Sequence, residues 1–219
     1  TVQFSSKSKL RKIEKGAFSF CEIGMINIPA SCVELVDGWF YNINEIEIDP
    51  KNENYKLYDN KMIIGKSTKE KTNFDVLVFC SRNATEIIIP DFIEIIGYSA
   101  FYECRRLKKI IIPANTKLKI IGKKAFKCSK IDKISIPSKV TKIGDWAFSS
   151  CYELHQIEIP NDSELQIIGE HALYEVPIET IFIPSQVTQI KNNAFDLCSE
   201  LKTIQFSEIL TSFSQFWFF

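Results

Sequence analysis

The sequence predicts a repeat solenoid, in which short coils of chain stack one on the next. Two markers recur in a single register along the 219 residues: an Ala-Phe or equivalent pair and an Ile-x-Ile-Pro tetrad. From Phe101 onward the first marker is spaced by 25, 22, 25 and 22 residues, so the period alternates between two lengths. The second side chain of this pair is, in chain order, Phe18, Phe40, Phe101, Phe126, Phe148, Leu173 and Phe195.

A single coil of this length cannot fold alone. About 23 residues lose roughly 35 kcal/mol of conformational freedom on ordering. Six or seven inward side chains return only about 10–20 kcal/mol by leaving water. Stacking in register supplies the missing backbone pairing and covers both faces of each inner layer. The energetics therefore favour a stack of about seven coils over independent units.

Each Leu-x-x-Ile-x-Ile-Pro segment predicts one short parallel strand. Apolar residues alternate along it, and the proline ends its hydrogen-bonded ladder. The third and fifth positions then face outward and form a mixed polar and apolar row, typical of a protein-contact surface. The alternative is a solvated sheet face without a partner. The row consists of Lys109, Ile111, Lys133, Ser135, Gln156, Glu158, Thr180, Phe182, Thr203 and Gln205.

The Gly-x-x-Ala-Phe segment places apolar residues three and four apart, which predicts a single helical or 3₁₀ turn. Its aromatic side chains are expected to point inward at Phe18, Phe101, Phe126, Phe148 and Phe195.

Cysteines follow these aromatic residues at short intervals: Cys21, Cys104, Cys151 and Cys198 by three residues, and Cys128 by two. We expect them to line the interior as small apolar side chains. A metal or redox ladder is the alternative. Cys32 and Cys80 lie outside this pattern, which leaves them free to be exposed.

The full repeat reads Ile-Gly-x-x-Ala-Phe-x-x-Cys-x-x-Leu-x-x-Ile-x-Ile-Pro, most clearly at 96–113 and 143–160. It resembles the leucine-rich repeat subtype of BspA-like surface proteins from bacteria and some parasitic protists. Nearly all of the chain shares the resemblance, with departures at Leu173 and around Phe40. The resemblance implies a right-handed leucine-rich repeat solenoid of α/β type, dominated by β structure, with about seven repeats of 22–25 residues.

One segment breaks the period. Residues 51–90 resemble the hairpin-bearing variant unit of the same family, with Asp59-Asn60 as the turn between two alternating runs. The rest of residues 1–219 reads as one solenoid domain, and both of its ends read as cut. The apolar tail at 207–219 is interpreted as a truncated repeat, with a cap or a contact surface as the alternatives.

Composition argues against several classes of function. Lys plus Arg equals Asp plus Glu, 27 against 27, so no net field attracts nucleic acid or an anionic membrane. The two histidines, His155 and His171, are expected on different faces and have no partners at triad or metal spacing. No apolar run is long enough to span a bilayer. We therefore expect neither an enzyme nor a cofactor or metal.

The predicted function is binding of another macromolecule. Resemblance to the BspA-like family implies a cell-surface or secreted protein that adheres to a host or matrix protein or glycoprotein. An intracellular scaffold in the cytoplasm is the alternative; free cysteines favour it, whereas the sequons at Asn83 and Asn161 favour export. A carbohydrate-active solenoid enzyme comes third, because it would need a carboxylate pair on one face, and the outward row has only Glu158.

Overall fold

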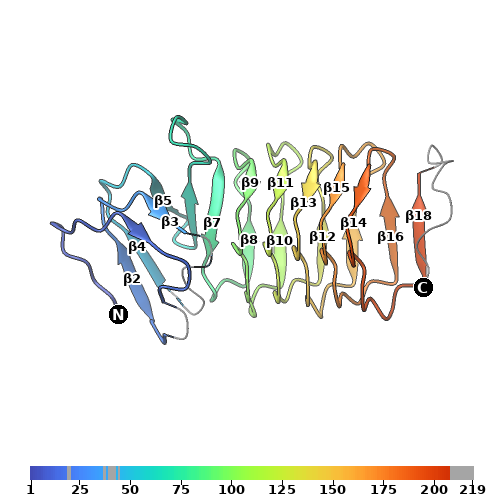
Figure 1. Ribbon diagram of the computed structural model, residues 1–219, viewed down its shortest axis with the longest axis horizontal. Coiled ribbons are helices and arrows are strands. Elements are labelled where there is room, and N and C mark those ends of the chain that lie inside the picture. Colours follow the sequence, from blue (N-terminus) through green and yellow to red (C-terminus); the bar gives the residue numbers. More distant parts are fainter. Residues whose placement is uncertain (19–20, 37, 39–42, 44, 208–219) are drawn as a thin grey trace.

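The computed structural model describes residues 1–18, 21–36, 38, 43 and 45–207, and in these it is a β-solenoid of about eight turns. Eighteen short strands follow one another without a helix in this described part of the chain. The coils stack along one long axis, with the first residues at one end of the molecule and the last coil at the other (Figure 1). No described segment is a helix long and apolar enough for a membrane crossing. Phe40 and residues 208–219 of the apolar tail lie outside the described residues.

The predicted strands form one row along the solenoid, which we call the outer row. Neighbours in it pair in parallel, β2 with β4, β8 with β10, β12 with β14 and β16 with β18. The outer row confirms the strand predicted from each Ile-x-Ile-Pro tetrad. Its members are β2 (Met25–Ile28), β4 (Glu45–Ile48), β8 (Glu86–Ile88), β10 (Lys109–Ile111), β12 (Lys133–Ser135), β14 (Gln156–Glu158), β16 (Thr180–Ile183) and β18 (Thr203–Phe206).

The outer row pairs its strands only two by two. Strand starts are 23 residues apart within each pair from β8 to β18, and 24 residues apart between pairs. No ladder joins β10 to β12 or β14 to β16. The extra residue at these steps shifts the backbone out of register with the next coil. This is the structural counterpart of the alternating period in the sequence.

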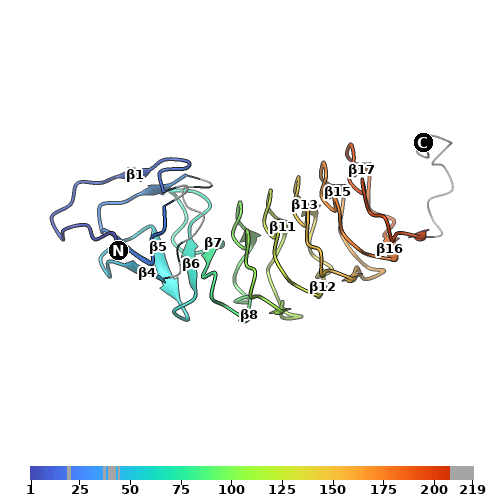
Figure 2. The ribbon, with the colours of Figure 1, turned by 90° about the horizontal axis from the view of Figure 1, so that it is seen from below.

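A second row of strands, of which the sequence predicted only the hairpin, lies on another side of each coil (Figure 2). Most of its members are only two residues long, too short to show a period-2 pattern. From β5 to β17 they form one eight-stranded sheet, while β1 pairs with β3. The row consists of β1 (Lys12–Ile13), β3 (Glu34–Leu35), β5 (Tyr55–Tyr58), β6 (Met62–Gly65), β7 (Val76–Cys80), β9 (Ile95–Ile96), β11 (Ile120–Ile121), β13 (Lys142–Ile143), β15 (Ile167–Ile168) and β17 (Gln189–Ile190).

The predicted hairpin is confirmed within this second row. β5 pairs antiparallel with β6, and β6 pairs antiparallel with β7, before β7 returns to parallel pairing with β9. Asp59 and Asn60 form the turn with φ of 48° and 49°. Both values lie in the left-handed region, and Lys61 N closes the turn by donating to Tyr58 O over 3.1 Å.

The predicted helical turn is wrong. In the turn after β9, Ser99 and Glu103 have φ of 54° and 53°, which interrupts any helix. Alternate amides there donate to the next coil instead of to their own turn: Ser99 N to Lys123 O (3.1 Å), Phe101 N to Ala125 O (2.7 Å) and Glu103 N to Lys127 O (2.9 Å). The same pattern recurs in the next three coils. Stacking therefore captures the donors that a helix would have used.

The inward aromatic side chains form a column between these turns. Phe101, Phe126 and Phe148 are fully buried, with ring centroids 4.8 and 5.2 Å apart and planes within 5° of parallel. Phe195, in the last coil, and Phe18, near the N-terminal end, are half-buried. The prediction that these rings face inward is confirmed for the three rings of the column, which we call the phenylalanine column.

The cysteine predictions are only partly confirmed. Cys104, Cys151 and Cys198 are buried as expected, but Cys21 is exposed. Cys128 takes the left-handed position of its turn (φ 59°), and the adjacent Ser129 occupies the inward site. The one-residue-shorter spacing from Phe126 explains this exchange.

Cys32 and Cys80 are fully buried, so the exposure left open for them is not observed. Cys32 follows the proline turn at the end of β2, and Cys80 ends β7. Both therefore pack in the cores that the strand rows enclose.

Candidate binding surface

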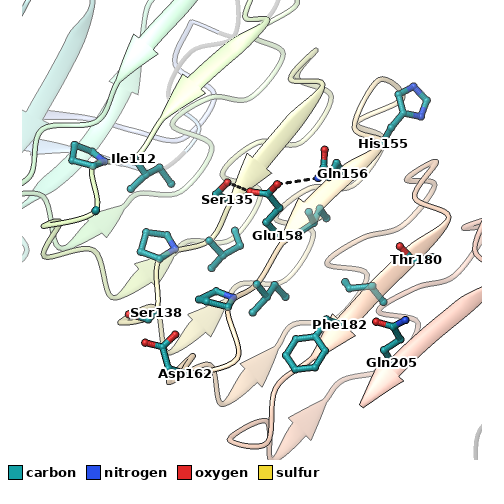
Figure 3. A pocket seen from close by; sticks show the side chains of 18 residues that line it. Ile112, Ser135, Ser138, His155, Gln156, Glu158, Asp162, Thr180, Phe182 and Gln205 are labelled. Atoms are coloured by element: carbon teal, nitrogen blue, oxygen red, sulfur yellow. Dashed lines mark hydrogen bonds between the residues drawn. The ribbon is translucent and has the colours of Figure 1, made fainter. Parts of the chain in front are cut away.

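An open hollow of ≈ 650 Å³ lies over the outer row, centred on β12, β14 and β16 (Figure 3). It coincides with much of the face predicted for binding. We call this feature the hollow. Its lining consists of Ile112, Pro113, Ala114, Ser135, Ile136, Pro137, Ser138, His155, Gln156, Ile157, Glu158, Ile159, Pro160, Asp162, Thr180, Ile181, Phe182 and Gln205.

The alternation of each strand presents polar side chains to the hollow. Ile134 and Ile157 point into the core, so the next residues, Ser135 and Glu158, face outward. These two are direct partners in the β12–β14 ladder. The Ser135 hydroxyl donates to Glu158 Oε2, and Gln156 Nε2 donates to Glu158 Oε1 over 2.9 Å. Two donors therefore hold the Glu158 carboxylate in one orientation before any partner arrives.

The structure places the predicted face residues in two groups. Six of them line the hollow: Ser135, Gln156, Glu158, Thr180, Phe182 and Gln205. Thr203, on β18, does not.

Lys109, Ile111 and Lys133 lie on the outer row beyond the rim of the hollow. Lys109 forms an ion pair with Glu86 on the neighbouring strand, with 2.9 Å between Nζ and Oε1. Ile111 and Phe182, expected to be exposed, are each half-buried.

Sequence reasoning missed the contribution of the prolines to the lining of the hollow. Pro113, Pro137 and Pro160 end successive strands of the outer row and all line the hollow. The tetrad pattern alone predicts only that each proline ends a ladder. The regular spacing of these prolines, directly after the outward residues, was the signal that could have identified them as part of the same surface.

The hollow holds two carboxylates, Glu158 and Asp162. In Figure 3 they lie apart, with Glu158 beside Ser135 and Asp162 towards Ser138. Within the described ranges, no three His, Cys, Asp or Glu side chains gather as a metal site. The arrangement can accept hydrogen bonds and attract a cation, and its prolines and Phe182 offer apolar contact.

The two histidines lie in different surroundings, as predicted. His155 lines the hollow, with Nδ1 3.3 Å from the carbonyl oxygen of Pro177. His171 stacks on Trp146, with ring centroids 4.1 Å apart, and its Nε2 lies 3.3 Å from Asn193 Nδ2.

A buried cysteine pair joins the hairpin unit to the first regular coil. Arg82 Nη1 donates to the carbonyl oxygens of Cys80 (2.9 Å) and Ala100 (3.2 Å) and lies 3.2 Å from Cys104 Sγ. Burial raises the pKa of Cys104, but the hydrogen bond from Cys80 and the charge of Arg82 outweigh it and lower this pKa to about 7. Burial holds the pKa of Cys80 well above its ordinary value. The group lies in the interior and serves packing between the two regions.

Comparison with known proteins identifies the repeat. A family model described as the BspA type leucine rich repeat region matches residues 1–75 and 72–202, with six copies. Among curated proteins, no sequence matches this chain.

Solved structures share the fold at low sequence identity. A leucine-rich repeat protein from Eubacterium ventriosum has a TM-score of 0.74 and 21% identity over 93% of this chain. A leucine-rich cell surface protein from Faecalibacterium prausnitzii has a TM-score of 0.60 and 21% identity over 94%. The pneumococcal vaccine antigen PcpA has a TM-score of 0.57 and 18% identity over 94%. The matches cover 53%, 59% and 62% of these three chains, respectively.

Proposed function

Because this chain belongs to the BspA-type leucine-rich repeat family, we propose that it is a non-enzymatic module that binds a protein or glycoprotein through the hollow of its outer row. The observation that carries the proposal is the Glu158 carboxylate, fixed by Ser135 and Gln156 in a hollow that the apolar Phe182 also lines. A charge already held in one orientation loses little conformational freedom on binding, and an aromatic side chain adds apolar contact area.

The shape of the hollow supports a macromolecular partner. Sites for small molecules enclose most of the ligand surface and are lined mainly by apolar groups. Here the hollow is open along several strands and mixes serine, glutamine and carboxylate side chains with prolines. An open, mixed surface that continues along the outer row suits the roughly 800 Å² that one partner contributes to a standard protein interface.

We place this activity at a cell surface, in adhesion to a host or matrix protein. Support comes from the structural neighbours, one of which is named as a leucine-rich cell surface protein and another as a vaccine antigen. Exposed sequon residues, Asn83 and Asn161, are compatible with export from a eukaryotic cell.

The second candidate is an intracellular scaffold that uses the same surface. Seven free cysteines favour it, because thiols persist in reducing compartments. Intact mass of native material separates the two: glycan on Asn83 or Asn161 supports export, whereas seven alkylatable thiols without glycan support the cytosol. An enzyme acting on carbohydrate would need Glu158 and Asp162 to act as a pair, and Figure 3 shows them apart.

Surface plasmon resonance against a panel of immobilised matrix proteins tests the proposal. For any protein that binds, the double variant Glu158→Lys with Phe182→Ala should weaken binding by about tenfold or more, since it removes both anchors. The matched control, Glu200→Lys with Leu197→Ala, makes the same change in charge and also shortens an apolar side chain, at exposed positions of the last coil. Equal weakening in both variants, or none in the first, would place the contact elsewhere.

A further inference from the structure

The neutral net charge conceals a strong segregation of charge along the solenoid. Residues 104–142 carry 13 Lys or Arg and a single acidic residue, Asp132. Residues 145–207 carry two Lys and ten Asp or Glu. Residues 1–103 carry 12 basic and 15 acidic side chains. The coils coloured green to yellow in Figure 1 are therefore a basic band between a nearly balanced section and a strongly acidic one, and we call residues 104–142 the basic band.

The charges of the basic band are largely unneutralised by the protein. Four of the 13 form ion pairs with carboxylates on the protein: Arg105 with Glu103, Lys109 with Glu86, Lys119 with Glu94 and Lys130 with Glu153.

The other nine cations of the basic band have no carboxylate at ion-pair distance among the described residues. They include Arg106, Lys108, Lys117 and Lys123, all of which are exposed. An excess of exposed, unpaired cations raises the local positive potential even when the whole chain is neutral.

These cations surround the coils on every side. Six lie at 105–109 and 130–133, where the chain enters β10 and β12 of the outer row. Four lie at 117–119 and 139–142, in the proline turns and the start of β13. Three lie at 123–127, in the left-handed turn. The basic band is therefore a belt about two coils wide instead of a patch on one face.

We propose that the basic band binds a flexible linear polyanion, a sulfated polysaccharide chain, that wraps across the coils. A flexible chain can follow the belt and reach cations on several sides at once. The acidic section at 145–207 repels the same chain, and residues 1–103 carry no excess of positive charge to attract it, so it runs across the solenoid axis and not along it.

Nucleic acids fit this surface less well. Duplex DNA is stiff, with a persistence length of about 50 nm, so it can touch only one side of the belt. Single strands gain affinity by stacking bases on open aromatic rings. The ring of Tyr98 lies under Lys124 Nζ at 5.9 Å, and that of Trp146 lies between Lys127 Nζ at 4.5 Å and His171. These two rings are already in contact with other side chains, so the belt attracts a single strand by charge but does not offer them as open surfaces for base stacking.

Isothermal titration calorimetry with dextran sulfate tests the proposal on the whole chain. Binding is expected at about 50 mM salt and should weaken by more than tenfold at about 200 mM, because condensed counterions are released on binding. Two charge-reversal pairs probe different parts of the belt: Arg106→Glu with Lys108→Glu at the entry to β10, and Lys117→Glu with Lys123→Glu on the two flanks of β11. Each pair should weaken binding by about tenfold, and the two effects should multiply in the quadruple variant.

The matched control is Lys9→Glu with Lys51→Glu, which makes the same change in net charge at exposed sites in the N-terminal section. It should change affinity by less than about twofold. If the control variant loses as much affinity as either reversal pair, net charge alone governs binding. If only one reversal pair loses affinity, the polyanion contacts only that part of the belt. Either result overturns the proposal, as do absent binding at low salt and tighter binding of duplex or single-stranded DNA of matched charge.

None of the four belt residues lines the hollow, so this test and that of the protein-binding surface fail independently. Circular dichroism verifies that each variant folds. If a reversal pair unfolds, the neutral Arg106→Gln with Lys108→Gln variant takes its place, with a smaller expected loss of the same sign.

Discussion

The regular coils from β8 to β18 and the hairpin unit around β5 to β7 satisfy the hydrogen bonds of their turns and loops in different ways. Regular coils satisfy every other turn amide through the next coil, as the Phe101 to Ala125 bond shows. The hairpin unit pairs β5, β6 and β7 within itself and anchors its loop through a single carboxylate, Asp75. In the first region stability is shared between neighbours, and in the second it is concentrated at a few local contacts. The destabilisation caused by a substitution should therefore reach neighbouring coils in the first region and stay local in the second.

Phe148→Ala should have the largest effect. It empties a fully buried site in the phenylalanine column and is expected to lower the free energy of unfolding by about 3–5 kcal/mol. Denaturant titration followed by circular dichroism measures the loss. Tyr152→Ala, at a side chain 64% exposed in the same coil, is the control and should cost less than about 1 kcal/mol. Equal costs would contradict an energetic role for the column.

Gly144→Ala should have the second largest effect and lower the free energy of unfolding by about 1–3 kcal/mol. A Cβ at this position would lie 2.7 Å from the Gly122 carbonyl carbon and from Lys123 N in the preceding coil, so backbone must move. The control is Gly24→Ala, where a Cβ meets nothing within 4 Å. A melting temperature unchanged by Gly144→Ala would show that the coils can separate at little cost.

Asp75→Asn should destabilise the hairpin unit by about 1–3 kcal/mol, because the Asp75 side chain is buried and accepts hydrogen bonds from Lys71 and Ser67. Hydrogen exchange should quicken at residues 66–95 and remain unchanged at 120–206. Uniform acceleration along the chain would contradict local anchoring.

Acid titration provides an independent readout of Asp75. Burial would raise its pKa, but the hydrogen bonds from Lys71 and Ser67 outweigh this and hold the pKa below its ordinary value of 3.8. The contribution of ionised Asp75 to the free energy of unfolding is therefore fully present above about pH 4. It is lost as the pH falls through the pKa of Asp75 in the folded state, which lies below the ordinary value. In Asp75→Asn this part of the acid sensitivity should disappear, while a Glu153→Gln control, exposed beside Lys130, should retain it.

Leu197→Gly should have the smallest effect and the opposite sign. Leu197 is 57% exposed and has φ of 56°, a conformation that favours glycine. We expect a gain of up to about 1 kcal/mol in the free energy of unfolding. A loss measured by denaturant titration would show that the exposed side chain packs against something in solution.

Sequence periodicity predicted the outer row and the phenylalanine column well, because repeated copies reinforce the same inward positions. It failed for the turn that contains Phe101, since apolar residues three and four apart occur both in a helix and in a turn with left-handed residues such as Ser99 and Glu103. It missed the two-residue strands of the second row, whose pairing depends on the neighbouring coil. Cys80 was misjudged because its burial depends on the hairpin, which breaks the repeat.

The candidate surfaces were predictable only in part. Alternation along β12 and β14 identified Ser135 and Glu158 as outward neighbours, whereas the hydrogen bond between them depends on their register across two coils. Total charge obscured the basic band, since a sum over the chain discards position. Charge counted coil by coil would have revealed it.

The two-by-two pairing of the outer row sets a rule for how such a molecule can lengthen. From β8 to β12, and again from β12 to β16, equivalent strands recur every 47 residues. We call an unpaired step between two outer-row strands a seam. Duplicating or deleting a block of 47 residues keeps paired steps and seams in alternation. Adding a single coil would break this alternation and place two seams, or two paired steps, next to each other. Viable length variants should therefore differ by even numbers of coils, and under mechanical tension the seams at β10/β12 and β14/β16 should part first.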